Sequence, residues 1–475
     1  MERIQTGNKE LDYILGGGLP NNSINLIIGL PGTGKTIMAE SMLFANTDPD
    51  KKILYLSTVS EPLDKIIRYL QGFTFFDSEA IAESIIYEDL SDTLWTTGLK
   101  GAVDKINALL KEHRPAFLAI DSFKALHAFS SSPEEFRRSL SAMASMLTSL
   151  AITTLWVGEY SSEEISIMPE FAIADSIIEL VIKKTGVTDA RYIRILKIRG
   201  TNFLGGEHAY KISDKGLEIF PRLTTPDQPI DYSLAKARAK TGVEALDGMI
   251  AEGFWSGSST VILGPPGSGK TLLGLHFIFK GIEAGEKGLI ATLEENPTQL
   301  ARIVAGFGWD LKRAINSGML ELMYVSPIEV YIDEFIQTLA KTIETKKVQR
   351  VLIDSLNDLE VSTHPPETFR NYIYALIQQM AVKGISVIMT NEIRSLFGTP
   401  YLSEYGISQM SDNVVLLHYI REGSEVKRAI VVLKTRASDH DPTIRQFIIT
   451  PEGITVGKAF TEQAAFGEHD RESSF

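Results

Sequence analysis

Two copies of one glycine-rich motif constrain this chain more than any other feature of its sequence. The pattern G-x-x-x-x-G-K-T occurs at residues 29–36 and again at 264–271. Its two lysines, Lys35 and Lys270, lie 235 residues apart in a chain of 475 residues. In this pattern a strand leads into the loop and a helix follows it, so that backbone N–H groups surround phosphate oxygens. The sequence therefore predicts two phosphate-binding sites, one in each copy of a repeated unit.

Each loop also supplies a lysine for the outer phosphates and a threonine hydroxyl for Mg²⁺. A glycine-rich turn that only caps a helix is the alternative interpretation, and the recurrence of the motif in register argues against it. The candidate nucleotide-binding residues are Gly29, Pro31, Gly32, Thr33, Gly34, Lys35 and Thr36 in the first copy, and Gly264, Pro266, Gly267, Ser268, Gly269, Lys270 and Thr271 in the second.

The repetition extends well beyond the loops. Thr6-Gly7 matches Thr241-Gly242, and the two halves align without gaps over about their first seventy residues. Later segments keep nearly the same spacing, with Asp121-Ser122 matching Asp354-Ser355. We therefore predict two domains joined by a proline-containing linker and followed by a flexible tail. Their expected bounds are 1–222 for the first domain, 223–239 for the linker, 240–459 for the second domain and 460–475 for the tail.

Within each half, short apolar runs alternate with amphipathic segments. Continuous apolar strands separated by helices are typical of a mostly parallel sheet covered on both faces. The fold class expected is therefore α/β, with two tandem P-loop domains. Apolar segments late in each half, at 177–182, 192–198, 414–419 and 429–434, are predicted to be antiparallel additions to the sheets.

Composition narrows the function classes. The net charge is −13 and the chain has no cysteine, which removes disulfides, thiolate metal sites and cysteine nucleophiles. Proteins that hold nucleic acid through its phosphates need clustered lysine and arginine, so an acidic chain without a dense basic run is not expected to bind it. The sequence contains no apolar run of about 18 residues, so no membrane span is predicted. A cytoplasmic location is the default expectation.

Asp121 and Asp354 each end a predicted buried strand. P-loop proteins keep at this place an aspartate that holds Mg²⁺. A serine follows each aspartate, so a helix N-cap is the alternative interpretation. The nearly equal spacing from the loop lysines, 86 residues in the first copy and 84 in the second, favours the metal role.

The two copies differ where a group that activates the nucleophile is expected. Glu294 and Glu295 follow the strand after the second phosphate loop, where a carboxylate could orient or deprotonate a nucleophile. The matching residues of the first copy are Val59 and Ser60, and Glu61 comes one residue later. The first site is therefore predicted either to turn nucleotide over slowly or to use Glu61 with poorer geometry.

Three further positions complete the candidate sites. Asn391 follows a predicted strand and is a candidate sensor of the γ-phosphate, whereas its counterpart is Gly158. Two Lys-x-Arg segments, with Lys197 and Arg199 in the first copy and Lys434 and Arg436 in the second, place two cations on one side of a strand. Such cations stabilise charge in phosphoryl transfer and can be supplied in trans. From spacing alone, surface charge explains them equally well.

Taken together, these residues resemble the KaiC family of circadian-clock ATPases, within the RecA-like group. The resemblance covers nearly the whole chain. It rests on the tandem loops, the T-G-x-x-x-L-D openings, Glu-Glu-x-Pro, the Asp-Ser pairs and the Lys-x-Arg segments. The segments 407–412 and 440–447 also resemble the second KaiC domain.

The resemblance implies two RecA-like domains, a homohexamer with ATP and Mg²⁺ between neighbouring subunits, and partners among clock-type regulatory proteins. Lys197, Arg199, Lys434 and Arg436 would then reach the nucleotide of the adjacent subunit.

The resemblance also implies autophosphorylation in the second domain, with Glu294 as general base. The family's Ser-Thr acceptor pair corresponds here to Ser408 and Gln409. Gln409 cannot accept a phosphoryl group, so Ser408 is the candidate phosphoacceptor and Ser411 a weaker one.

The function expected is that of a KaiC-like ring ATPase. Hydrolysis is assigned chiefly to the second domain, through Lys270, Glu294, Glu295, Asn391, Lys434 and Arg436, with serine autophosphorylation as a further activity. Two alternatives stay open at this point. One is a nucleotide-gated interaction scaffold, and the other is a DNA recombinase or helicase relative, which the acidic charge disfavours.

Overall fold

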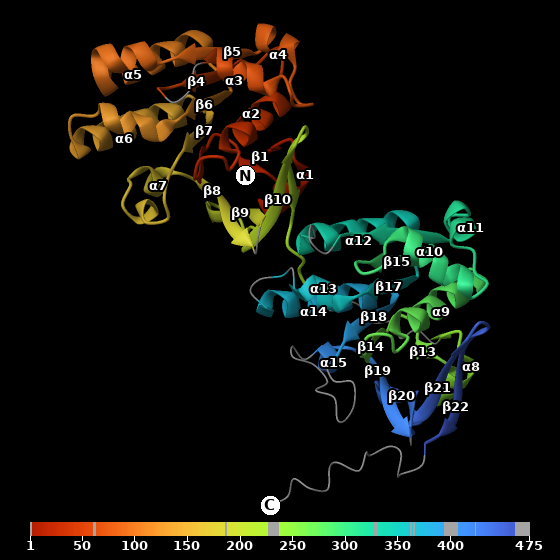
Figure 1. Ribbon diagram of the computed structural model, residues 1–475. Helices are drawn as coiled ribbons and strands as arrows, with labels where there is room; N and C mark the ends of the chain where they lie inside the picture. The colour runs from red at the N-terminus through yellow and green to blue at the C-terminus, as the bar shows by residue number, and fades with distance from the viewer. Residues whose placement is uncertain are drawn as a thin grey trace, which may run out of the picture. The chain divides into compact units, whose positions relative to one another are not determined.

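The computed structural model divides into two compact units, Met1–Arg222 (unit 1) and Leu223–Phe475 (unit 2) (Figure 1). Leu223 packs against the core of unit 2, and the carbonyl oxygen of Thr224 accepts a hydrogen bond from Gln379 Nε2 at 2.9 Å. The residues that the structure describes are 2–59, 63–185, 188–226, 237–326, 331–361, 363, 366–393, 407–422 and 424–460. Most of the predicted linker and all but the first residue of the predicted tail lie outside them.

Unit 1 is built on a nine-stranded sheet in the order β11-β10-β9-β8-β3-β7-β6-β4-β5. Strands β8, β3, β7, β6, β4 and β5 run parallel, whereas β9, β10 and β11 continue the sheet in antiparallel pairing. The strands span β3 Ile24–Gly29, β4 Ile53–Ser57, β5 Ile85–Asp89, β6 Phe117–Asp121, β7 Thr153–Gly158, β8 Ser176–Thr185, β9 Thr188–Ile198, β10 Glu207–Ser213 and β11 Gly216–Phe220, with a separate pair β1 Arg3–Ile4 and β2 Leu19–Pro20.

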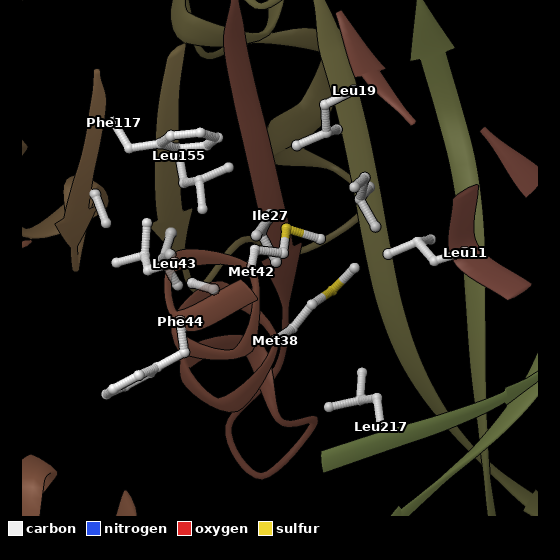
Figure 2. Close-up of a cluster of buried hydrophobic side chains, with 14 of the residues drawn as sticks. Leu11, Leu19, Ile27, Met38, Met42, Leu43, Phe44, Phe117, Leu155 and Leu217 are labelled. Atoms are coloured by element: carbon white, nitrogen blue, oxygen red, sulfur yellow. The ribbon is translucent and has the colours of Figure 1, made fainter. Parts of the chain in front are cut away.

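Hydrophobic clusters lie on both faces of this sheet. Successive residues of a strand point to opposite faces, so Ile27 of β3 packs in one cluster while Leu26 and Ile28 pack in the other. Figure 2 shows Met38 and Met42 of α2 close to Ile27 in the first cluster. The helices of unit 1 are α1 Lys9–Ile14, α2 Lys35–Ala45, α3 Leu63–Leu70, α4 Ser78–Glu83, α5 Ser91–His113, η1 Phe123–Phe129, α6 Pro133–Ser149, η2 Glu164–Ser166 and α7 Glu170–Ile173.

Unit 2 repeats this architecture in the order β16-β15-β17-β18-β14-β19-β20-β21-β22. Its strands span β14 Ser259–Gly264, β15 Gly288–Thr292, β16 Leu320–Tyr324, β17 Arg350–Asp354, β18 Ser386–Glu392, β19 Asn413–Glu422, β20 Glu425–Thr435, β21 Arg445–Thr450 and β22 Gly453–Ala459, with the pair β12 Arg238–Ala239 and β13 Phe254–Trp255. Its helices are α8 Glu244–Met249, α9 Lys270–Glu283, α10 Pro297–Gly306, α11 Leu311–Asn316, α12 Ile332–Lys346, α13 Leu356–Val361, α14 Pro366–Val382 and α15 Ile407–Met410. Clusters on both faces again make the core.

The predicted fold class is confirmed: each unit is a mostly parallel sheet flanked by helices (Figure 1). The prediction of antiparallel additions holds for only one strand of each pair. β8 and β19 run parallel to β3 and β14, and only β9 and β20 turn back. The long connection before β8, which contains α7, returns the chain to the edge where β3 starts, as a parallel pairing requires.

Candidate nucleotide-binding sites

In both units the phosphate loop joins the end of a central strand to the start of a helix. β3 ends at Gly29 and α2 begins at Lys35, whereas β14 ends at Gly264 and α9 begins at Lys270. The strands β3 and β14 are buried along their whole length. Each loop is therefore held at the carboxyl edge of a rigid sheet, where the helix N-terminus favours an anion.

A glycine before each helix lets the loop turn close beneath a hairpin. Gly34 and Gly269 have φ angles of 89° and 103°, in the left-handed region. A Cβ atom at Gly34 would lie 2.8 Å from Cδ1 of Ile212, and one at Gly269 would lie 2.9 Å from Cε1 of Phe447. Both features require glycine at these positions.

The loop lysine of unit 1 folds back over its own loop. Lys35 Nζ donates a hydrogen bond to the carbonyl oxygen of Leu30 at 3.0 Å and lies 3.9 Å from an oxygen of Glu159. Burial lowers the pKa of Lys35, while the charges of Glu159 and Asp121 oppose that shift.

The loop lysine of unit 2 takes the same position. Lys270 Nζ donates to the carbonyl oxygen of Pro265 at 3.1 Å. Burial lowers its pKa, and the charges of Glu392, Glu294 and Asp354 oppose the shift. Both lysines are therefore available to phosphate oxygens without first leaving a strong ion pair.

Asp121 and Asp354 lie beside the loop threonines, as a shared metal site requires. In unit 1, Thr36 Oγ1 donates to Asp121 Oδ2 at 2.7 Å, and Tyr55 donates to the same oxygen at 3.1 Å. In unit 2, the hydroxyls of Thr271 and Thr390 hydrogen bond to Asp354. Burial raises the pKa of Asp354 against these bonds.

Glu294 lies close enough to this group to interact with it electrostatically. Desolvation, followed by the negative charge of Asp354, raises the pKa of Glu294, and the charge of Lys270 opposes the shift. The backbone N–H of the next residue, Glu295, donates to Thr292 Oγ1 at 3.1 Å. In unit 1 the position of Glu294 is taken by Val59, which is exposed, while Ser60 and Glu61 lie outside the described residues.

The sheet register places Asn391 and Gly158 at equivalent positions. Asn391 lies opposite Leu263 in β14, and Gly158 lies opposite Ile28 in β3. The Asn391 side chain is buried, and its Oδ1 has no hydrogen-bond partner within the described part of the chain. At this register position the second site therefore has a polar side chain, whereas the first has a glycine.

Reasoning from the sequence missed one glutamate in each unit, at equivalent positions near the loop lysine. Glu159 follows β7 beside Lys35, and Glu392 ends β18 where its charge acts on Lys270. The signal was present in the repeat, because these glutamates keep the spacing of Asp121 and Asp354.

The residues of both loops fit Mg²⁺ and a nucleotide. A hydroxyl and a carboxylate are the hard oxygen donors that Mg²⁺ prefers, and this cation usually takes few protein ligands together with phosphates and water. The described residues hold no group of three or more histidine or acidic side chains arranged for a metal. In the second loop, Ser268 Oγ is buried and lacks a protein partner among the described residues, which leaves a donor for an incoming phosphate.

The Lys-x-Arg segments hold a short helix in each unit. Lys197 Nζ donates to the carbonyl oxygens of Phe171 and Ala172 at 3.1 and 3.2 Å, and Arg199 also bonds to Ala172 O at 2.8 Å. These carbonyls belong to α7.

The second unit repeats these bonds on α15. Lys434 Nζ bonds to the carbonyl oxygens of Ser408 and Ser411 at 3.1 and 2.6 Å, and Arg436 bonds to that of Gln409 at 2.9 Å. Ser408 is half-buried, whereas Ser411 is fully buried.

Both Lys-x-Arg segments lie at the edge of the sheet opposite their own phosphate loop. The Asp412 N–H donates to Ser259 O at the start of β14, and Arg436 N donates to Asp412 O. The loop follows Gly264 at the other end of β14, roughly 17 Å away at about 3.3 Å per residue. Lys434, Arg436 and Ser408 are therefore not brought to the nucleotide site of their own unit, and unit 1 shows the same separation for Lys197 and Arg199.

Two other features lie outside these sites. A cavity of about 280 Å³ in unit 1 is bordered by α1, α2 and β11 and includes no residue of either phosphate loop. In the parts of the chain that the structure describes, no helix has both the length and the apolar character needed to cross a membrane.

Comparison with known proteins agrees with this geometry. The family model described as "ATPase: KaiC" matches residues 4–224 and again 239–460. The circadian clock protein KaiC3 of Synechocystis sp. is 29% identical, with 97% of this chain and 92% of that protein aligned. The circadian clock oscillator proteins KaiC of Picosynechococcus sp. and of Thermostichus vulcanus are each 28% identical, with 97% of this chain and 90% of either protein aligned. The chain, with two phosphate loops on two sheets of one topology, belongs to the KaiC family of ATPases.

Proposed function

We propose that both loops bind Mg-ATP and that hydrolysis takes place chiefly in unit 2. The observation that carries this proposal is Glu294, an acid with a raised pKa within electrostatic reach of Lys270 and Asp354. In unit 1 the equivalent residue is Val59, whose side chain cannot take a proton.

The residues of unit 2 have separate tasks in this scheme. The loop amides and Lys270 hold the phosphates, and Thr271 and Asp354 hold Mg²⁺, which when bound neutralises charge on the phosphate oxygens. Glu294 accepts a proton from the attacking water as the new P–O bond forms at the γ-phosphorus. The bond from that phosphorus to the β,γ-bridging oxygen breaks, and ADP leaves with the electron pair.

A neighbouring subunit completes each site in this proposal. Lys434 and Arg436 lie at the far edge of their own sheet, so they contribute to phosphoryl transfer only if another copy of the chain presents that edge to the loop. The same holds for Lys197 and Arg199 in unit 1. A closed homo-oligomer, a hexamer by analogy with the family, meets this requirement.

Ser408 is proposed to be the phosphoacceptor. It lies on α15 beside Lys434 and far from the loop of its own unit, so the transfer proceeds between subunits. Its hydroxyl oxygen attacks the γ-phosphorus, its proton passes to Glu294, and ADP leaves. Gln409, the next residue, has no hydroxyl, so of this pair only Ser408 can accept a phosphoryl group.

The relatives are named as circadian clock proteins. From this similarity we propose that the chain is a regulatory ATPase that responds to nucleotide and works with clock-type partner proteins. A cysteine-free chain with this activity is expected in the cytoplasm.

Separate substitutions of the loop lysines test the unequal roles. Lys270→Ala should abolish most steady-state ATP turnover, because its charge no longer faces the phosphates, whereas Lys35→Ala should leave most of it. Phosphate release at saturating Mg-ATP measures both. Full turnover in the Lys270→Ala chain together with none in the Lys35→Ala chain would reverse the assignment.

A mixing experiment tests Ser408 and the direction of transfer. Ser408→Ala chains keep an intact second loop, and Lys270→Ala chains keep the acceptor serine. After the two are mixed with Mg-ATP, mass spectrometry should find phosphate on Ser408 of the Lys270→Ala chains, and neither variant alone should be labelled. Phosphate on Ser408 of Lys270→Ala chains that have not been mixed with the other variant would contradict transfer from the nucleotide of unit 2.

A nucleotide-gated scaffold remains a second candidate for unit 1. The observation that favours it is the absence of a side-chain acid or amide at Val59 and Gly158, around an otherwise complete loop. In that case ATP at the first loop holds the oligomer together. Lys35→Ala should then shift the oligomer to smaller species in size-exclusion chromatography with light scattering.

A further inference from the structure

The two aspartates proposed to hold Mg²⁺ receive a second hydroxyl from different strands. In unit 2, Thr390 of β18 donates to Asp354 Oδ1 in addition to the bond from Thr271. Thr390 follows Met389, which lies opposite Ile353, so the threonine stands directly beside the aspartate.

Unit 1 lacks this threonine. The residue opposite Asp121 in β7 is Val157, which has no donor. The second hydroxyl comes instead from the other side, because Tyr55 of β4 donates to Asp121 Oδ2 at 3.1 Å. The counterpart of Tyr55 in unit 2 is the apolar Ile290.

The local packing explains why a tyrosine fits in only one unit. Tyr55 lies opposite Ala119, whereas Ile290 lies opposite Leu352. The small side chain of Ala119 stands on the same face as Asp121 and leaves room for the phenol to reach the carboxylate. In unit 2 that volume belongs to Leu352, which packs so tightly that a Cβ on Gly274 would lie 2.5 Å from its Cδ1.

The Tyr55 ring packs against Tyr87, which is itself hydrogen bonded to Glu40. The rings of Tyr55 and Tyr87 lie 5.2 Å apart, and the two residues are directly opposite each other in β4 and β5. Tyr87 donates its hydroxyl to Glu40 Oε2 at 2.9 Å, on the helix that begins at the phosphate loop. Tyr55 and Glu40 are completely buried, and the counterparts of Glu40 and Tyr87 in unit 2 are Leu275 and Leu322.

We propose that Tyr55 is a positioning residue for Asp121, replacing in unit 1 the hydroxyl that Thr390 supplies in unit 2. By fixing the carboxylate beside Thr36, Tyr55 sets the affinity of the first site for Mg²⁺ bound with a nucleotide. Groups that orient a metal-holding carboxylate commonly change metal affinity by about tenfold or more when removed. The inference rests on the proposed nucleotide binding at the first loop.

The test measures binding rather than turnover. In full-length chains that carry Lys270→Ala, a fluorescent non-hydrolysable ATP analogue is titrated at a series of Mg²⁺ concentrations and in EDTA. Tyr55→Phe should raise the Mg²⁺ concentration for half-maximal enhancement of binding by about tenfold, with affinity in EDTA changed by less than about twofold. Tyr160→Phe is the matched control, because it removes a buried hydroxyl that bonds to Glu170 instead.

Rescue separates positioning from a general loss of structure. Adding Val157→Thr to Tyr55→Phe should restore the Mg²⁺ dependence to within about threefold of the starting chain, because the donor returns from the strand that carries it in unit 2. An unchanged Mg²⁺ dependence in Tyr55→Phe, or a loss that Val157→Thr does not repair, would overturn the inference. If the starting chain binds no analogue at all, the proposed function of the first loop fails as well, and that result is distinct from a bound analogue with an unaltered response to Mg²⁺.

Discussion

The two units share a frame but differ in what surrounds the nucleotide. In each unit a loop lysine, a loop threonine and an aspartate lie together at the carboxyl edge of that unit's own sheet. Around unit 2 stand Glu294 and Asn391, which suit chemistry on a phosphate. Behind the loop of unit 1 stand buried polar groups that have no counterpart in unit 2. In the proposed scheme the groups of unit 2 serve turnover, whereas the buried groups of unit 1 tune the binding of nucleotide and Mg²⁺.

The largest expected effect breaks this comparison at Glu294. Glu294→Gln keeps the shape of the side chain but removes the base, so steady-state ATP turnover should fall by about a thousandfold. Nucleotide affinity should change little. Because the base must be ionised, turnover of the unmodified protein should also decline as the pH falls through the raised pKa of Glu294.

Glu283→Gln is the matched control for that change, since Glu283 pairs with Lys280 at the exposed end of α9. Its turnover should match that of the unmodified chain. A Glu294→Gln chain that kept more than about a tenth of its activity would remove the proposed distinction between the units.

Much of this arrangement was open to prediction from the sequence. The α/β class and the parallel strands followed from buried apolar runs such as residues 117–120, because a strand covered on both faces needs mostly apolar side chains. The direction of β8 and β19 was not predictable, because apolar content does not record where a crossover returns the chain.

The candidate sites divide in the same way. The loop residues are fixed by local backbone geometry, and a short motif therefore reports them. By contrast, no short motif predicts the contacts among Tyr55, Tyr87 and Glu40. These residues come from three separate elements and are brought together only by the fold. Lys434 and Ser408 were predicted individually, but their distance from the loop of their own unit emerged only from the strand register.

The second effect concerns Glu40 and sharpens the comparison through pH. Complete burial raises the pKa of Glu40 from its ordinary value near 4.5 to about 8, the bond from Tyr87 opposes the shift, and the charge of Asp121 adds to it. The folded state therefore keeps this proton between about pH 4.5 and 8 while the unfolded chain releases it. Stability from this group is complete below that window and declines as the pH rises through it.

Glu40→Gln should remove this decline, because an amide does not ionise and still accepts the bond from Tyr87. Relative to the unmodified chain, the free energy of unfolding of unit 1 should rise by about 2–3 kcal/mol between pH 6 and pH 8. Hydrogen exchange of α2 in urea at the two pH values measures the change for unit 1 separately. Leu275→Met in α9 serves as the control, since Leu275 occupies the place of Glu40 and carries no proton. Equal pH dependence in the Glu40→Gln and unmodified chains would show that Glu40 ionises normally.

The smallest effect is expected at the carboxylate that both units share. Glu159 lies 3.9 Å from Lys35 with its side chain 56% exposed, and solvent-exposed pairs of this kind contribute at most about 1 kcal/mol. The carboxylate competes with phosphate oxygens for the lysine and repels them. Glu159→Gln and Glu392→Gln should therefore each tighten ATP binding by no more than about threefold, and added salt should reduce the change. Titration of the fluorescent analogue at two ionic strengths measures this change in affinity.

The sign of the change should be the same in both units, because Glu159 and Glu392 occupy equivalent positions of the repeat. A Glu392→Gln chain with unchanged affinity but more than about a tenfold loss of turnover would instead assign Glu392 to the chemistry of the second site, and the two units would then differ in the use of a residue that they both retain.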